Sequence, residues 1–215
     1  MLDLQEKNVL GLLYRPVGRE QHMQRAEIIQ AAAQIFRHKG YHGTSMQDIA
    51  DAVSLKKASL YHHVSGKQDI LVSILDQALD MLIEDLKEVL AKDLPAKEKV
   101  RQAMRAYVNR LTQDPDLAAV LLMEHRSLED DLREDHIARR DRFEDLWRKM
   151  IEQGVQEGVF RPLDRNLATF ALLGVLNWMI TWYRPNGRMR AEMIADQFAD
   201  LVLGGLVMQG DGRER

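Results

Sequence analysis

The chain has 215 residues, 46% of them apolar, which is enough for one small and one medium domain with buried cores. Its formal net charge of −3 and its pI near 6.2 exclude a histone-like polycation. It has no cysteine, which excludes disulfides and thiolate metal sites and fits a reducing cytoplasm.

The charge is distributed unevenly along the chain. Residues 15–70 carry eight lysines and arginines against five acidic residues, a net charge of +3, so the remainder carries −6. A basic N-terminal region followed by an acidic body is typical of a protein whose first domain binds nucleic acid.

Residues 1–20 are predicted to form an N-terminal arm. The short apolar run from Val9 to Tyr14 and the acidic residues Asp3 and Glu6 argue against a secretory signal or a membrane span. Two interpretations of the arm remain open. It is a weakly packed segment, or its Arg15 and Arg19 reach the minor groove of DNA.

Residues 21–39 are predicted to form an amphipathic helix that ends at Gly40. Next, Thr44 and Gln47 have the spacing of a capping box and predict the start of a short helix. Val53, Ser54 and Leu55 interrupt its pattern, and residues 56–63 predict a second short helix. Two short helices joined by a tight turn form a helix-turn-helix, whose second helix fits the major groove of DNA.

This region closely resembles the TetR family of bacterial regulators over residues 22 to about 75. The resemblance rests on Phe36 to Tyr41, Thr44-Ser45-Met46, Ile49-Ala50, Leu60 to His63, and Gly66 to Leu71. The sequence departs from the family pattern at Ser54, where a turn glycine is usual, and at Lys56 and Val64.

The resemblance implies a DNA-binding domain over residues 21–67 and a homodimer that binds double-stranded operator DNA. By family analogy, the base-edge contacts are Lys56, Ala58 and Ser59. The expected contacts with the DNA backbone are Thr44, Lys57, Tyr61, His62 and Lys67.

Residues 68–215 are predicted to form a helical ligand-binding and dimerisation domain. Helices are expected at about 68–90, 96–111, 117–125, 127–152, 164–183 and 190–208, and Pro95, Pro115, Gly154, Gly158 and Pro162 separate several of them. No strand pattern occurs, so the predicted fold is all-α.

The last two helices are the most apolar part of the sequence. Their side chains, expected to face each other, offer more apolar surface than one helical hairpin can bury, which predicts packing against a second copy. The TetR resemblance implies a four-helix dimer interface here. The alternative is that these helices only close the core of their own subunit.

The helix at 127–152 has an apolar stripe that includes His136 and Arg139. A charged arginine on an apolar face must be paired, reach solvent or meet an anionic ligand. Asp135 or Glu124 pairs with it, or it lines the entrance of a ligand pocket. Asn177, on a later apolar helix, raises the same question.

No sequence signature indicates an enzyme, a cofactor or a metal site. The adjacent His62 and His63 point about 100° apart on a helix, and no His-Glu-x-x-His motif, phosphate loop, dinucleotide fingerprint or nucleophile elbow occurs.

The predicted function is a cytoplasmic, ligand-responsive transcriptional repressor. Residues 147–185 look like TetR-family regulators of fatty-acid and sterol degradation, several of which respond to acyl-CoA thioesters. The residues expected to bind a hydrophobic or acyl-CoA effector are Tyr107, Met123, His136, Arg139, Phe143, Trp147, Asn177, Trp178 and Trp182. The alternatives are a regulator without a small-molecule effector, including an activator, a multidrug-type sensor, and a helical lipid-binding or scaffold protein.

Overall fold

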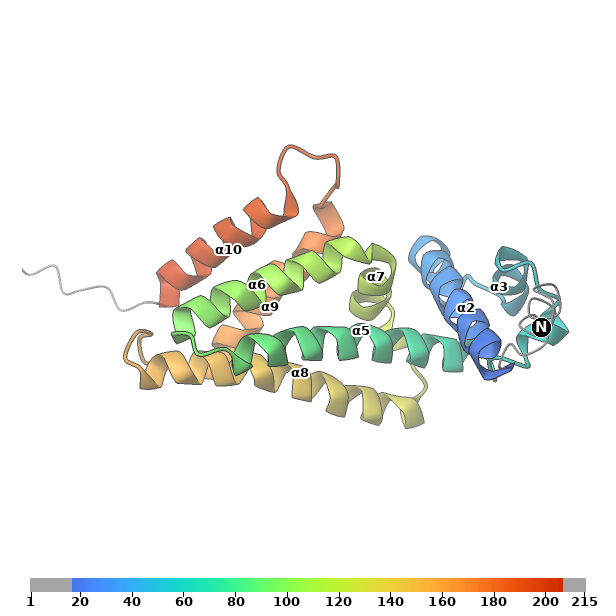
Figure 1. Cartoon of the computed structure of the whole chain (residues 1–215), viewed down its shortest axis with the longest axis horizontal. Coiled ribbons are helices and arrows are strands. Elements are labelled where there is room, and N and C mark those ends of the chain that lie inside the picture. Colours follow the sequence, from blue (N-terminus) through green and yellow to red (C-terminus); the bar gives the residue numbers. More distant parts are fainter. Residues whose placement is uncertain (1–16, 207–215) are drawn as a thin grey trace, which may run out of the picture. The chain divides into compact units, whose positions relative to one another are not determined.

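The computed structural model describes residues 17–206, which form nine α-helices and one short 3-10 turn at His125–Ser127 (Figure 1). The helices are α2 (Val17–Lys39), α3 (Met46–Ala52), α4 (Lys57–Leu60), α5 (Lys67–Ala91), α6 (Ala96–Gln113), α7 (Pro115–Met123), α8 (Asp130–Gln156), α9 (Arg165–Trp182) and α10 (Ala191–Leu206). The fold is all-α, as predicted. Most of the predicted arm, including Arg15, and the side chain of Arg19 lie outside the described residues.

The chain divides into two compact units, Met1–Ile74 and Leu75–Arg215. The sequence pattern predicts the division after residue 67, the first residue of α5. The structure shows that α5 is one continuous helix whose first eight residues belong to the first unit and whose remainder belongs to the second. Within residues 17–206, no helix is both long and apolar enough to cross a membrane.

In the first unit, two local signals fix where α2 ends and α3 begins. Gly40 has φ 73° and donates its amide to the carbonyl of Phe36, so α2 ends where predicted. The predicted capping box was wrong by one residue. Ser45, not Thr44, accepts the amide of Asp48, and the Asp48 carboxylate accepts the Ser45 amide.

The turn between α3 and α4 depends on Ser54. This residue has φ 55°, a left-handed conformation that glycine adopts more easily. Its amide bonds the carbonyl of Asp51 and the Leu55 amide bonds the carbonyl of Ala50, which is the hydrogen-bond pattern of a Schellman motif. The helix-turn-helix therefore keeps its turn with a serine where the family pattern has glycine.

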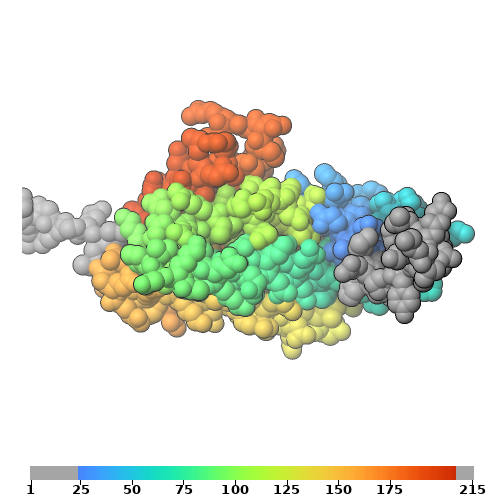
Figure 2. Space-filling model, viewed as in Figure 1, coloured from blue at the N-terminus to red at the C-terminus, as the bar shows by residue number. Residues whose placement is uncertain are grey.

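In the second unit, α6 packs against α7, α8, α9 and α10. Figure 1 shows α10 lying along α6, and in the space-filling view of Figure 2 the red side chains of α10 rest on the green ones of α6. Two ion pairs join these helices, Arg101 to Asp200 at 2.6 Å and Arg105 to Asp196 at 2.5 Å. The expectation that α9 and α10 mainly face each other was therefore wrong.

Gly154 does not end a helix, contrary to the sequence expectation. It lies inside α8, and a Cβ atom there would overlap the ring of Phe160, which is 1% exposed. The chain leaves the helix two residues later and turns at Gly158, with φ 70°. The missing side chain at Gly154 allows Phe160 to fold back onto the end of α8.

Candidate nucleic-acid interface and ligand pocket

The exposed face of the helix-turn-helix is formed by α4 and the turn that follows it. Helix α4 spans only Lys57–Leu60 and is shorter than the predicted helix at 56–63. Leu60 is fully buried and anchors it, whereas the flanking side chains point to solvent. Among the predicted DNA contacts, the exposed ones are Lys56, Lys57, Ala58, Tyr61 and His62, and Ser59 is half-buried.

Two other predicted DNA contacts point into the unit. Thr44 is 3% exposed and donates its hydroxyl to the carbonyl of Gly40 at 2.8 Å. The Lys67 ammonium donates to the carbonyls of Tyr41 and Thr44 at 2.8 and 2.7 Å and lies over the Tyr41 ring. An ammonium has three donors, so Lys67 holds the loop before α3 and keeps one donor for another acceptor.

Arg25, on α2, holds the two ends of the loop between α4 and α5 in place. Its guanidinium donates to the carbonyl of His63 at 2.5 Å, to Asp69 at 2.8 Å and to the hydroxyl of Ser73 at 2.9 Å. Although burial opposes it, these bonds and those from Ser65 hold the pKa of Asp69 below its ordinary value. The position of the exposed α4 face is thus fixed by charge-assisted hydrogen bonds.

The second unit contains a cavity of about 280 Å³. Side chains from α5 to α9 line it, including four of the predicted effector contacts, Tyr107, His136, Phe143 and Asn177. Its other polar residues, which were not predicted from the sequence, are His125, Arg140 and Glu144. Most of the apolar wall was not predicted either, and it is formed by Leu79, Leu82, Leu121, Leu122, Phe170 and Leu173.

The remaining predicted effector contacts do not line this cavity. Trp147 is fully buried in the core, where its ring packs edge-on against Tyr107 and Phe143. Met123, Trp178 and Trp182 are exposed, at 59%, 66% and 42%. Burial therefore separates three kinds of apolar residue, core, cavity wall and surface, that helical spacing alone does not distinguish.

Arg139 also lies outside the cavity, and its predicted partners were wrong. It bonds Asp76 at 3.0 Å and Asp80 at 2.5 Å, both on α5, instead of Asp135 or Glu124. Burial raises the pKa of Asp76 despite the nearby guanidinium of Arg139. Arg139 thus joins α8 to α5, while His136 and Arg140 on the same helix face the cavity.

Three of the polar side chains that line the cavity, Tyr107, Asn177 and His136, are uncharged. Burial raises the pKa of Tyr107, whose hydroxyl stays protonated and donates to Asn177 Oδ1 at 2.5 Å. His136 is 6% exposed and stacks on His125. Burial, and then the nearby His125 and arginines, lower the pKa of His136 to about 4, so the ring is neutral at pH 7. Its Nδ1 has no hydrogen-bond partner within residues 17–206.

The charged groups at the cavity are paired with each other. Glu144 accepts a hydrogen bond from Arg148 at 2.6 Å and lies 3.6 Å from Arg140. Arg148 is held further by Asp145, which raises its pKa. Arg140 is about half exposed, so its guanidinium presents a positive charge at the edge of the cavity.

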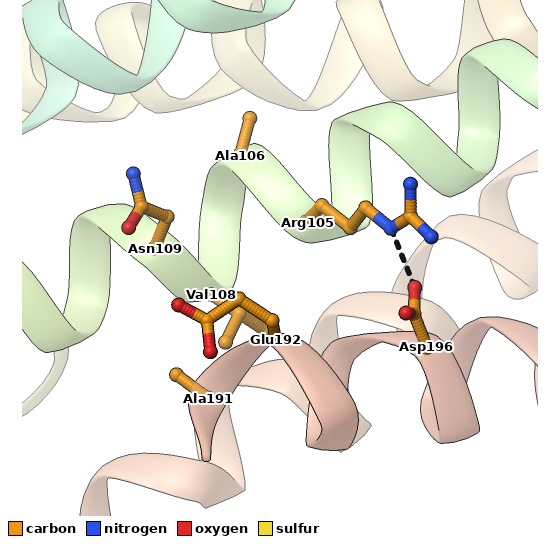
Figure 3. Close-up of a pocket in the computed structure, with 7 residues that line it drawn as sticks. All are labelled: Arg105, Ala106, Val108, Asn109, Ala191, Glu192 and Asp196. Carbon is orange, nitrogen blue, oxygen red and sulfur yellow. Dashed lines mark hydrogen bonds and ion pairs between the residues drawn. The ribbon is translucent and has the colours of Figure 1, made fainter. Parts of the chain in front are cut away.

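A second hollow, of about 470 Å³, lies between α6 and α10 (Figure 3). Figure 3 shows Arg105 of α6 bonded to Asp196 of α10 across it, with Asn109 and Glu192 nearby. Its charged groups are thus partly satisfied by each other, and none of the buried polar atoms that lack a partner among the described residues belongs to its lining.

Two family models match the chain, one in each unit. The model for bacterial regulatory proteins of the tetR family matches residues 28–74, and the tetracyclin repressor-like C-terminal domain matches residues 93–206. The second match alone covers more than half of the chain. The chain belongs to the TetR family. It is therefore a DNA-binding transcriptional repressor and not an enzyme, and α4 lies within the residues that the DNA-binding model matches.

Individual TetR-family proteins resemble this one over both units. The repressor KstR2 of Rhodococcus jostii is 30% identical over 85% of this chain and 90% of its own length. The crystal structure of PfmR from Thermus thermophilus has 41% identity and a TM-score of 0.78, covering 84% of this chain and 99% of that one. The crystal structure of AibR in complex with isovaleryl coenzyme A and operator DNA has 32% identity and a TM-score of 0.78. It covers 83% of this chain and 97% of that one.

Proposed function

We propose that this repressor acts as a homodimer on a roughly palindromic operator and that an acyl thioester bound in the 280 Å³ cavity releases it. The observation that carries the proposal is the cavity itself. It has apolar walls, a few convergent polar groups and a cation at its edge, which is the composition of a small-molecule site. A repressor acts where the chromosome lies, so the proposal keeps the cytoplasmic location expected from the sequence.

The exposed residues around α4 support the DNA contacts of the proposal. Two copies related by a two-fold axis would present their recognition helices to successive major grooves, roughly 34 Å apart. Lys56, Ala58 and Ser59 are proposed for base edges. Lys57, Tyr61 and His62 are proposed for phosphates, with Thr44 and Lys67 bracing the loop beside them.

The surface of α9 and α10 supports the dimer. The residues Leu167, Phe170, Trp178 and Leu201 are between 54% and 74% exposed, and Trp182 and Met193 exceed 40%. Burying one such side chain contributes on the order of 2 kcal/mol, so a second copy that covers this set gains enough to dimerise stably. A hollow of about 340 Å³ between these helices, beside Leu167 and Leu201, offers room for side chains of the second copy.

The acyl thioester is favoured over other effectors by the relatives together with the cavity. AibR is known in complex with isovaleryl coenzyme A, an acyl thioester. The apolar wall suits the acyl chain, and Arg140 at the edge suits a phosphate-bearing carrier. This assignment moves the predicted anionic contact from Arg139 to Arg140, one residue later on α8.

Helix α5 provides a direct route from the cavity to the DNA-binding unit. Leu79 and Leu82 of α5 line the cavity, and the same helix begins in the first unit. A ligand that fits best when α5 is tilted would move the recognition helices out of register with successive grooves. Binding of the ligand and binding of the operator then weaken each other reciprocally. The size of this effect is set by the difference between the ligand's affinities for the two states.

The test is to titrate the complex of the full-length protein and its operator with acyl-CoA thioesters, a free fatty acid and a planar aromatic drug. We expect release by acyl-CoA, and a weaker response when Arg140 is replaced by Ala. Release by the drug alone would favour a multidrug-type sensor, and release by none would favour a regulator without a small-molecule effector. Absence of any operator footprint would favour the lipid-binding or scaffold alternative.

A further inference from the structure

The size of the cavity limits the acyl group that it can take. A water molecule occupies about 30 Å³ of liquid and a methylene group is of similar size, so 280 Å³ holds roughly nine non-hydrogen atoms. A short or branched acyl group fits within this volume. A long-chain acyl group or a steroid nucleus would extend beyond it.

The charges around the cavity limit the chemistry of the part of the ligand that is buried. Glu144, at the cavity wall, is 9% exposed, and the nearby His136 ring is neutral. A ligand carboxylate buried here would meet a like charge and would lose its hydration, which is costly. A thioester carbonyl carries no charge and avoids both costs.

His136 provides the polar contact that such a carbonyl needs. Its Nδ1 is buried at the cavity wall without a partner among the described residues, and a buried polar atom of this kind normally finds one. The indole nitrogen of Trp147 is similarly buried, but Trp147 does not line the cavity. Tyr107 donates its only hydroxyl proton to Asn177 Oδ1, whereas His136 in the Nδ1–H tautomer has a buried donor that no described residue accepts from.

We propose that the effector is a short-chain acyl thioester whose carbonyl accepts a hydrogen bond from His136 Nδ1, with the acyl group enclosed and the carrier outside beside Arg140. This inference rests on the proposed function and narrows it. His136 is then the residue that distinguishes thioesters from free acids and from ligands without a carbonyl.

The experiment measures binding of defined probes to the full-length protein by calorimetry. The probes are hexanoyl-CoA, palmitoyl-CoA, hexanoate and hexyl-CoA, a thioether that lacks the carbonyl. We expect hexanoyl-CoA to bind at least tenfold more tightly than each of the others, about the effect of one hydrogen bond or more. In His136→Phe, the preference for hexanoyl-CoA over hexyl-CoA should disappear.

His136→Asn is the matched control, because its amide nitrogen lies near the position of Nδ1 and can donate to the same carbonyl. It should retain most of the preference for the thioester, and thermal melting of both variants shows whether they are folded. If His136→Phe does not fold, the comparison of hexanoyl-CoA with hexyl-CoA in the wild type still tests the carbonyl contact.

Each contrary result overturns one defined part of the proposal. Equal binding of palmitoyl-CoA overturns the size limit, and equal binding of hexanoate overturns the exclusion of carboxylates. A preference for the thioester that persists in a folded His136→Phe overturns the role of His136. In these cases, release of the operator by any acyl-CoA would leave the proposed function standing, whereas a failure of every acyl-CoA to bind would remove both.

Discussion

At the scale of single residues, the structure separates side chains that line the cavity from side chains that hold helices together. His136 and Arg139 are three residues apart on α8, yet one faces the cavity and the other bonds α5. Helical spacing placed both in one stripe. Because the partners of Arg139 are about sixty residues away in the sequence, no local pattern identifies them. Arg140, by contrast, follows His136 by four residues and so lies on the same face of α8. This spacing could have identified Arg140 as the arginine at the cavity.

The neutral state of His136 makes stability depend on pH. Its pKa is about 4 in the folded protein and near 6.5 in the unfolded chain, so only the unfolded chain binds the proton in between. The free energy of unfolding should therefore fall as the pH falls from 6.5 to 4, by about 2 kcal/mol at pH 5. Burial lowers the pKa of His125 as well, which adds to the same trend.

Urea unfolding at pH 7.5 and pH 5 measures this effect. The decrease in stability should be smaller in both His136→Phe and His136→Asn, because neither side chain titrates. Carboxylates such as Asp69, whose pKa is lowered, also stabilise the fold, but this contribution is lost only at still lower pH, where they become protonated. An unchanged decrease in both variants would show that other groups are responsible.

Lys67 is expected to act on both stability and DNA binding. Lys67→Met removes two hydrogen bonds to loop carbonyls, so the melting temperature should fall, and operator and unrelated DNA should both bind more weakly. If the third donor reaches a phosphate, the slope of log affinity against log salt should decrease by about one. Lys57→Met is the control for a solvent-facing lysine, expected to change the slope without changing the melting temperature. An unchanged slope for Lys67→Met would leave it only a bracing role.

At the scale of helices and turns, most of the fold could be predicted from the sequence. Prolines, glycines and apolar spacing placed nearly every helix, because these signals act within a few residues. The capping box was one residue off because Thr44-Gln47 and Ser45-Asp48 both have the required spacing. Burial of Thr44 against Gly40, and the Lys39–Asp48 ion pair, favour the second register, and both depend on how α2 packs.

The Ser54 turn gives a prediction about stability. A residue with a side chain in the left-handed region costs about 1 kcal/mol relative to glycine, so Ser54→Gly should stabilise the protein by up to that amount. The melting temperature should rise by about 2 to 4 °C for a chain of this size. Ser54→Asn should lie close to the wild type and Ser54→Val should lower the melting temperature. A decrease in Ser54→Gly would mean that the serine side chain contributes something that the turn geometry does not explain.

At the scale of the whole molecule, the exposed apolar side chains are concentrated on two helices. Seven of the ten large apolar residues exposed in the described chain lie on α9 and α10. The sequence identified the excess of apolar surface there, but only burial shows that α10 also packs along α6 and keeps Leu201 outside. A single copy does not cover this surface.

Charge substitutions on this surface test the dimer. Leu201→Glu and Trp178→Glu should give folded monomers in sedimentation experiments, because a carboxylate buried in an apolar interface costs several kcal/mol. Ile137→Glu is the matched control, since Ile137 is also an exposed apolar residue, 40% exposed, but belongs to α8 and not to α9 or α10. Dimers that persist in both test variants would place the interface elsewhere, and dissociation of the control as well would show a general loss of structure.

Helix α9 contributes to both the cavity and the proposed dimer surface. Leu173 and Asn177 line the cavity, Trp178 is exposed on the outside, and Phe170 takes part in both. In a dimer, a ligand that shifts α9 in one subunit therefore changes the surface against which the other subunit packs. The two cavities should not fill independently, and ligand binding to the dimer should show a Hill coefficient different from one, which the monomeric Leu201→Glu variant should restore to one.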